Sequence, residues 1–487
     1  MPPTGHVTRR QLLRSAALGG AGLTLAGGAG ELIAGALAAA DVRPPRAPRW
    51  RSRPDLRIPA LSVTRAEDGA SREPIFIAPY NAPAGSQAGA VIVDHDGEPV
   101  WENPLPDRVT TNFRVQSYRG SPVLTWWEGI IELGHGVGEY VIADSGYRTV
   151  RRVRAGRGLH GDLHEFVITP RDTALLTSYV VRSADLTSVC GPRRGTIQDA
   201  IFQELDLATG EVLMEWRSLE HVALTESFWP VGSDWDFFHI NSVDLDGDDS
   251  FLVSARSTHT VYKISRSGEI LWRLGGARSD FELGPGAHFA WQHDARRRPD
   301  GALSILDNGA APAVESRSRA LILALDEDAM RATLVEQYSH PRVLAASQGN
   351  VQLLAGGNVF VGWGEVPRVS EFERSGRMVF DALLGSRYEC YRAFRLPWSA
   401  QPALAPALAL RSRGSRLTAY ASWNGATEVA RWRLLAGTDA ALLKPVAHTD
   451  AAGFESALRT SRAGPLFAVQ ALGAHGEPLA RSRALSV

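Results

Sequence analysis

The stretch VYKISRSGEILWRL, residues 261 to 274, has the pattern of a β-hairpin. Apolar and polar residues alternate on both sides of a polar turn, and the turn contains a glycine, which tolerates the backbone angles of tight turns. The pattern recurs about every 50 to 60 residues, so it is a repeat rather than an isolated hairpin. The other copies are VIVDHDGEPVW (91 to 101), VIADSGYRTVRRV (141 to 153), FQELDLATGEVLMEW (202 to 216), LILALDEDAMRATLVEQY (321 to 338) and VSEFERSGRMVF (369 to 380).

A second pair of strands lies between successive hairpins, as in HINSVDLDGDDSFLVSAR from His239 and HDARRRPDGALSILDN from His293. Four strands per repeat and about six repeats predict an all-β fold with a six-bladed β-propeller over residues 71–397. From residue 398 onward, short alternating strands are separated by Gly, Asn and Asp turns. This part predicts a small β-sandwich of the immunoglobulin or fibronectin type III kind, residues 398–487, with Trp423 and Trp432 in its core.

Polar residues open the first strand of most repeats. Because the first strand of a propeller blade lies nearest the axis, residues at matching positions are expected to form a ring around the central channel. That ring comprises Asn112, His164, His239, His293 and Asn350. A second ring is expected from the end of the next strand and comprises Tyr179, Arg256, Asn308 and Trp363. A single His or Asn at a strand start often only satisfies backbone groups, but three histidines at one repeat position favour a site.

The N-terminus has the features of a targeting segment. Arg9 and Arg10 precede a weakly hydrophobic Gly/Ala-rich run that ends in ALAAA near residue 40. This resembles a twin-arginine export signal over residues 1–40, followed by a lead-in over residues 41–70. We therefore expect export through the twin-arginine machinery to the periplasm, the cell wall or the exterior. An uncleaved membrane anchor or a disordered tail is the alternative, and no other segment is apolar enough to span a bilayer.

Composition limits the remaining classes. The 487-residue chain is 44% hydrophobic and 22% charged with a formal net charge of -1. It is therefore globular, and nucleic acid is not an expected partner. Cys190 and Cys390 are too far apart in sequence for a CxxC motif, and the sequence leaves open whether they form a disulfide.

The ring residues admit two kinds of chemistry. Three histidines can hold zinc, but the ring histidines lack the spacing of ligand pairs, so we expect no metal. Glu165 and Asp294 directly follow two of them and are expected either to orient the imidazoles or to be ordinary polar residues at strand ends. The other reading is transfer of an anionic group, with a neutral imidazole as nucleophile and cationic or amide groups around the transferred oxygens. The groups expected to bind those oxygens are Arg256 and Asn241, and the aromatic residues expected to hold a flat substrate, or else to pack in the core, are Trp235, Phe238, Phe289 and Trp291.

Several of these segments together resemble the bacterial arylsulfate sulfotransferases, which take sulfate from a phenolic sulfate ester without PAPS. The segments are HGDLHEF (160 to 166), FFHINSVDLDGDDSFLVSAR (237 to 256), WRLGG (272 to 276), WQHDARRRPDG (291 to 301) and DNG (307 to 309). The resemblance covers about residues 50 to 397. It implies a ping-pong reaction through a sulfohistidine, a phenolic sulfate donor, a phenol acceptor and no cofactor.

The resemblance also implies roles for particular residues. His293 matches the nucleophile, whereas His239, Asn241 and Arg256 match groups that bind sulfuryl oxygens and assist the phenolic oxygen. His164 matches a histidine supplied by an earlier blade. The substrate-binding set expected around them is Asn241, Trp235, Phe238, Trp291, Asn308 and Tyr179.

Two other functions are compatible with the sequence. ELDLATGEVLMEW resembles the tryptophan-docking repeat of quinoprotein propellers with a PQQ cofactor, but those generally have eight blades and often adjacent cysteines. A non-catalytic propeller that binds a glycan or a cell-wall ligand, with the histidines as a polar plug, remains an alternative.

Overall fold

The computed structural model describes residues 49–487 apart from 59–60, 84–85, 248, 386 and 462–463. The expected export signal lies outside the described residues. The described chain is almost entirely β-structure, with only three short helical segments: η1 (Thr187–Val189), α3 (Ser218–His221) and η2 (Leu224–Glu226). The prediction of an all-β fold is confirmed.

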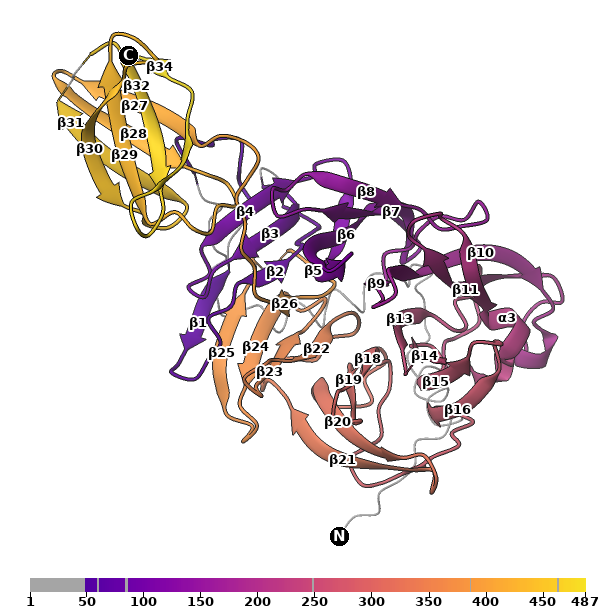
Figure 1. Ribbon diagram of the computed structural model, residues 1–487. Helices are drawn as coiled ribbons and strands as arrows, with labels where there is room; N and C mark the ends of the chain where they lie inside the picture. The colour runs from indigo at the N-terminus through magenta and orange to yellow at the C-terminus, as the bar shows by residue number, and fades with distance from the viewer. Residues whose placement is uncertain (1–48, 59–60, 84–85, 248, 386, 462–463) are drawn as a thin grey trace.

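Residues 62–395 form six sheets, which Figure 1 shows arranged around a common centre. In spatial order the first sheet contains β26 (Phe394–Arg395), β2 (Ile75–Ile77), β3 (Gly89–Val93) and β4 (Pro99–Pro104). The second contains β5 (Val109–Tyr118), β6 (Ser121–Glu132), β7 (His135–Ala143) and β8 (Thr149–Val153). The third contains β9 (Phe166–Ile168), β10 (Thr173–Ala184), β11 (Gly195–Asp206) and β12 (Val212–Arg217).

The second half of the ring continues in the same way. The fourth sheet contains β13 (Ile240–Leu245), β14 (Ser250–Ala255), β15 (Thr260–Ser265) and β16 (Ile270–Gly275). The fifth contains β18 (His293–Arg297), β19 (Leu303–Asp307), β20 (Arg319–Asp326), β21 (Arg331–Tyr338) and β17 (Glu282–Leu283). The sixth contains β22 (Asn350–Leu353), β23 (Val359–Gly362), β24 (Arg368–Phe372), β25 (Met378–Leu383) and β1 (Ser62–Ala66).

The hairpin of residues 261 to 274 is formed by β15 and β16, with Gly268 in its turn at φ 91°. The ring is closed by both ends of residues 62–395. The first strand, β1, pairs with β25 in the sixth sheet, and the last strand, β26, pairs with β2 in the first sheet. β3 is buried on both faces, which is why its sequence GAVIV is apolar throughout. Six apolar clusters fill the spaces between neighbouring sheets, one for each pair around the ring.

The innermost strands bring their first residues to the centre of the ring. Figure 1 shows β5, β9, β13, β18, β22 and β26 on the inner side of their sheets. His164, His239 and His293 lie directly before or at the start of three of these strands. The fold therefore gathers at its centre residues that are up to about 130 positions apart in the sequence.

A separate unit follows the ring. One of its sheets contains β27 (Ala407–Arg413), β28 (Arg416–Ser422) and β31 (Glu455–Ser461). The other contains β30 (Lys444–Asp450), β29 (Arg431–Gly437), β32 (Leu466–Leu472), β33 (Pro478–Arg481) and β34 (Leu485–Ser486). The two sheets share one apolar core, and Trp423 and Trp432 are buried in it.

This unit contacts the outer part of the first two sheets. Tyr147 stacks on Trp101 with ring centroids 4.7 Å apart, and its hydroxyl donates to the carbonyl of Gly425 over 2.8 Å. Both cysteines are free, Cys190 being exposed and Cys390 buried. Among the described residues, no helix has the length and apolar character needed to cross a membrane.

Candidate active site

His293 is held by hydrogen bonds on both ring nitrogens. Its Nδ1 faces two acceptors, Asn308 Oδ1 at 2.8 Å and the carbonyl of Trp291 at 3.2 Å, whereas the backbone N–H of Gln348 donates to Nε2 over 3.1 Å. Asn308 is oriented in turn, because its Nδ2 donates to the carbonyl of Gln348 over 3.0 Å. Two acceptors on one side and a donor on the other place the proton on Nδ1 and the lone pair on Nε2.

The surroundings of His293 keep it neutral. The side chain is buried, and burial together with the positive charge of Arg256 holds the pKa of His293 well below its usual value. A neutral imidazole with its lone pair on Nε2 is the form that acts as a nucleophile.

Arg256 follows β14 and places a cation close to His293. The guanidinium carbon lies 5.1 Å from the ring centroids of both Trp229 and Trp291, so the cation is flanked by two indoles. Its Nη2 donates to the carbonyl of Ala346 over 3.1 Å. These contacts hold the charge in place on one side of the histidines.

His239 precedes β13 in a left-handed backbone conformation, with φ 59°. Its carbonyl accepts a hydrogen bond from the N–H of Arg256 over 2.9 Å, which ties the two residues together. Its Nδ1 makes a short hydrogen bond with Asp236 Oδ2. Burial lowers the pKa of His239 to about 4, although the Asp236 carboxylate opposes this shift.

His164 precedes β9 and forms a similar pair with Asp162. The Nδ1 atom of His164 lies 2.6 Å from Asp162 Oδ2, so Asp162 binds Nδ1 and not Nε2. Asp162 also accepts from the N–H groups of His164 and Gly136 and from Thr177 Oγ1. Its desolvation is outweighed by the nearby histidines and these donors, so the pKa of Asp162 is lowered.

The three predicted histidines form one cluster. The ring centroids of His164 and His239 are 4.8 Å apart, and those of His239 and His293 are 6.4 Å apart. Imidazoles at this spacing, with Arg256 beside them, can surround a group of the size of sulfate.

The sequence model of the arylsulfotransferase (ASST) family matches residues 114–385, more than half of the chain. The chain belongs to the arylsulfotransferase family. The matched span contains His164, His239, Arg256 and His293, all four residues that the sequence analysis singled out as catalytic. The predicted membership is confirmed.

Solved structures with a similar course of the chain exist at low identity. A protein of unknown function from Bacteroides caccae is 12% identical with a TM-score of 0.41, over 66% of this chain and 98% of that one. Virginiamycin B lyase from Staphylococcus aureus is 9% identical with a TM-score of 0.33, over 74% of this chain and 94% of that one. A search of curated proteins finds no match.

The histidine cluster contains a further histidine that was not predicted from the sequence. His135 is the first residue of β7, and its ring stacks on Tyr179 with centroids 3.8 Å apart. Its ring centroid lies 5.4 Å from that of His239 and 5.9 Å from that of His164. It stands at the tip of a hairpin in the sequence LGHGVG and not at a repeated position, so periodicity carries no signal for it.

The partners of the histidines also differ from expectation. Glu165 and Asp294 do not orient the imidazoles; Glu165 instead pairs with Arg114 at 3.0 Å and with Arg392 at 3.1 Å. Asp294 also pairs with Arg392, with its Oδ1 3.4 Å from Nη2 of the arginine. The carboxylates that orient the imidazoles are Asp162 and Asp236, which precede their histidines by two and three residues.

Asn241 and its equivalents connect neighbouring sheets. Asn241 Nδ2 donates to the carbonyl of Gln292 over 2.7 Å, and its Oδ1 accepts from the N–H of Asp294 over 3.3 Å. Asn112 and Asn350 bind the backbone of the next sheet in the same way. Asn241, and not His239, therefore occupies the position in its sheet that Asn112 occupies in the second sheet. The first ring expected from the sequence was shifted by two residues at this position.

The predicted aromatic residues separate into two groups. Trp235 and Phe238 are buried in the apolar cluster between the third and fourth sheets, which is the core role weighed in the sequence analysis. Trp291 lies beside Arg256, and Phe289 packs between the fourth and fifth sheets. Tyr179 contacts His135, and its hydroxyl donates to the carbonyl of Ile240 over 2.7 Å.

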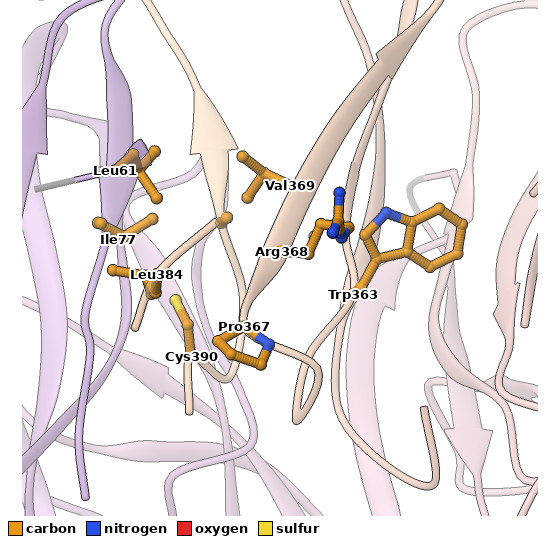
Figure 2. A pocket seen from close by; sticks show the side chains of 10 residues that line it. Leu61, Ile77, Trp363, Pro367, Arg368, Val369, Leu384 and Cys390 are labelled. Atoms are coloured by element: carbon orange, nitrogen blue, oxygen red, sulfur yellow. The ribbon is translucent and has the colours of Figure 1, made fainter. Parts of the chain in front are cut away.

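Trp363, expected in the second ring, does not join the histidine cluster. Figure 2 shows it with Arg368 and Cys390 around a small cavity of about 10 Å³, room for about one water molecule. Its indole N–H donates to Ser370 Oγ over 3.0 Å.

A larger cavity of about 460 Å³ is lined by the loop before β5 and by the end of β6, including Arg108, Ile130 and Tyr80. A hydrogen-bonded path leads from its wall to His293. Tyr80 donates to Glu389 Oε2 over 2.9 Å, and Gln348, whose N–H binds His293, donates its side chain to the same oxygen over 2.8 Å.

Proposed function

We propose that this arylsulfotransferase moves a sulfuryl group from a phenolic sulfate ester to a phenol by a ping-pong mechanism, with a sulfohistidine at His293 as the intermediate. One observation carries the proposal: the hydrogen bonds of His293 leave the lone pair on Nε2, in a buried site that keeps the ring neutral. Family membership supports aryl sulfotransferase activity in general.

In the first half-reaction, Nε2 of His293 attacks the sulfur of the donor. The N–S bond forms as the bond from sulfur to the phenolic oxygen breaks, and the phenolic oxygen leaves with the bonding electrons. Arg256 binds the sulfuryl oxygens, whose negative charge is redistributed during transfer. Asp236 holds a proton of His239 on Nδ1, so Nε2 of His239 donates to these oxygens in the imidazolium form, which the sulfate anion stabilises. The N–H of Gln348 yields its place at Nε2 to the sulfur.

Proton transfer falls to His164. Asp162 binds its Nδ1, so Nε2 is the nitrogen that can exchange a proton with the phenolic oxygen. His164 protonates the leaving phenolate in the first half-reaction and takes the proton of the acceptor phenol in the second. The acceptor oxygen then attacks sulfur, the N–S bond breaks and neutral His293 is restored.

The aryl group is held by Trp291 and Trp229 in this proposal. Both indoles lie beside Arg256, whereas Trp235 and Phe238 pack in the core.

We further propose that the six sheets are the blades of a six-bladed propeller that begins with β1 at Ser62, before the expected start at residue 71, and ends at residue 397, and that residues 398–487 are a β-sandwich. Six cores between six successive sheets, with β1 and β26 closing the ring, support the first part. The arginine pair at positions 9 and 10 supports export by the twin-arginine pathway as a folded protein.

The test is nitrophenol release from 4-nitrophenyl sulfate in the presence and absence of phenol. Wild-type protein is expected to release nitrophenol in a phenol-dependent manner, and His293→Ala and Arg256→Ala are expected to lose this activity. His448→Ala, an exposed position in the C-terminal unit, serves as the matched control. A folded wild-type protein that releases nothing with several phenols overturns the proposal in favour of a binding propeller.

A further inference from the structure

His135 is buried without hydrogen bonds. Its exposed fraction is 5%, and neither ring nitrogen has a hydrogen-bond partner among the described residues. Nε2 lies 3.2 Å from Asp236 Oδ2, close but outside hydrogen-bond geometry. Asp236 is thus the one charged neighbour of the ring that the ion pairs among the described residues give, and the hydrogen-bonding capacity of both nitrogens is unused, which costs about 1–3 kcal/mol for a buried polar group.

A second buried atom without a partner lies beside it. Asp236 binds His239 through Oδ2, but Oδ1 of Asp236 has no hydrogen-bond partner among the described residues. Ligand atoms of His135, Asp236 and His239 all lie within 4.8 Å of one another. Two imidazole nitrogens and one carboxylate oxygen at this spacing are a common ligand set for a divalent transition-metal ion with an open position.

We propose that His135, Asp236 and His239 bind a divalent transition-metal ion of the Zn²⁺ kind. The ion takes one ring nitrogen of His135 and a carboxylate oxygen of Asp236, groups to which the described residues give no full set of hydrogen bonds. No metal was expected from the sequence, because His164, His239 and His293 lack ligand spacing, and His135 and Asp236 were outside that set.

Asp162 and His164 form the other candidate group with His135, but their carboxylate is already occupied. Both oxygens of Asp162 accept hydrogen bonds, from Gly136, His164 and Thr177. Asp162 therefore orients His164, while Asp236 has an oxygen to offer. This contrast selects Asp236 as the carboxylate ligand.

The proposed ligands are positioned before an ion arrives. The ring of His135 stacks on Tyr179, whose hydroxyl is fixed to the carbonyl of Ile240, next to His239. His239 is held by the hydrogen bond between its carbonyl and the N–H of Arg256. Such preorganisation lowers the entropy that binding an ion must overcome.

The inference goes beyond sulfuryl transfer and does not depend on it. Nδ1 of His239 faces Asp236, so an ion held there leaves Nε2 of His239 for the sulfuryl group. Metal binding and transfer can therefore be measured separately on the same protein.

The test uses the full chain, purified without a polyhistidine tag and treated with EDTA. ZnCl₂ is titrated by calorimetry, and CoCl₂ binding is followed by visible absorption, which reports nitrogen and oxygen ligands at a site of low coordination number. We expect one equivalent to bind. We expect His135→Ala and Asp236→Asn each to weaken binding on the order of 100-fold or more, since each loses a ligand.

Two controls address other sites for the ion. His448→Ala removes an exposed histidine and Cys190→Ser removes the exposed thiol, and both are expected to bind like wild type. Circular dichroism shows which variants are folded, and Asp236→Asn preserves side-chain shape should His135→Ala not fold. A wild type that binds no equivalent of Zn²⁺, binding unchanged in His135→Ala and Asp236→Asn, or binding lost in Cys190→Ser overturns the inference.

Nitrophenol release measured in parallel separates the two proposals. Binding that depends on His135 in a protein without transferase activity supports the metal site and overturns the proposed function. Transfer by a protein that binds no ion overturns the metal site alone.

Discussion

Asn308 fixes the tautomer of the proposed nucleophile. Its Oδ1 receives the proton of His293 Nδ1, so its loss allows the lone pair to move away from Nε2. Asn308→Ala is expected to lower kcat by about 100-fold with a small change in KM, because orientation of the nucleophile is lost while substrate contacts remain. Asn308→Asp keeps an acceptor at Nδ1 and is expected to recover part of kcat. Wild-type kcat in Asn308→Ala contradicts this role.

His259 makes stability depend on pH. Its ring stacks on Phe228 and meets Trp291 edge-on, and burial, with the charge of Arg256 adding to it, lowers the pKa of His259 to about 3. The unfolded chain therefore takes up a proton below about pH 6.5 that the folded chain refuses, and stability is lost as the pH falls toward 3.

His259→Asn tests this contribution, since asparagine tolerates the left-handed φ of 53° at this position. Between pH 7 and pH 5 the free energy of unfolding of the wild type is expected to fall by about 2 kcal/mol more than that of His259→Asn. Urea unfolding at the two pH values measures the difference. Equal falls in both proteins contradict a buried neutral His259.

At the scale of single residues, part of the candidate site could be predicted from the sequence. His164, His239, Arg256 and His293 were identified by repeat position and by motif, and the structure brings them together at the centre of the ring. Asp236 and Asp162 are near their histidines in sequence, but acidic residues next to turns are too common to single out. His135 could not be found, because its place follows from the packing of β6 and β7 against the third sheet.

Between the elements, Arg392 ties the inner strands of several sheets together. Its side chain is fully buried and contacts Glu165, Asp294, Asn112 Oδ1 at 3.0 Å and the carbonyl of Asn241 at 2.7 Å. Removing one partner of a buried ionic network leaves other charges without compensation.

Arg392→Met is therefore expected to destabilise the fold by about 3–5 kcal/mol. Arg377, an exposed arginine that pairs with Glu373 and Glu67, is the matched control, and Arg377→Met is expected to leave Tm nearly unchanged. Thermal unfolding of both variants provides the comparison. An equally small effect at both positions means that the network is not structural.

The hairpins were predictable because each depends on a local pattern of alternation and turn residues, as β15 and β16 illustrate. The closing strands β1 and β26 were not predicted as elements. β26 has only two residues, and both strands pair with partners about 300 positions away, so no local pattern specifies them.

For the whole molecule, contacts around Tyr147 join the C-terminal unit to the ring, alongside those that Trp50 and Ser52 make with Phe454 and Glu455. The hydroxyl of Tyr147 donates to Gly425 and accepts from Trp398 Nε1 over 3.1 Å. Asn424 also donates to the carbonyl of Glu102 over 2.9 Å. The histidine cluster lies at the centre of the ring, away from this junction.

Tyr147→Ala is expected to loosen the junction and to leave the chemistry intact. Limited proteolysis between residues 397 and 406 should become faster, because the linker gains freedom when the stack on Trp101 is lost. The kcat of sulfuryl transfer should stay within about twofold of wild type. A large fall in kcat with unchanged proteolysis contradicts a purely structural junction.

The central claim is that His293 carries the sulfuryl group between donor and acceptor. It is tested most directly by mixing the protein with 4-nitrophenyl sulfate without an acceptor, quenching at alkaline pH and mapping the modified peptide by mass spectrometry. The account predicts a mass increase of one sulfuryl group on His293, which disappears when phenol is added and is absent from His293→Ala. A sulfuryl group on another residue, or phenol-dependent turnover in His293→Ala, contradicts it.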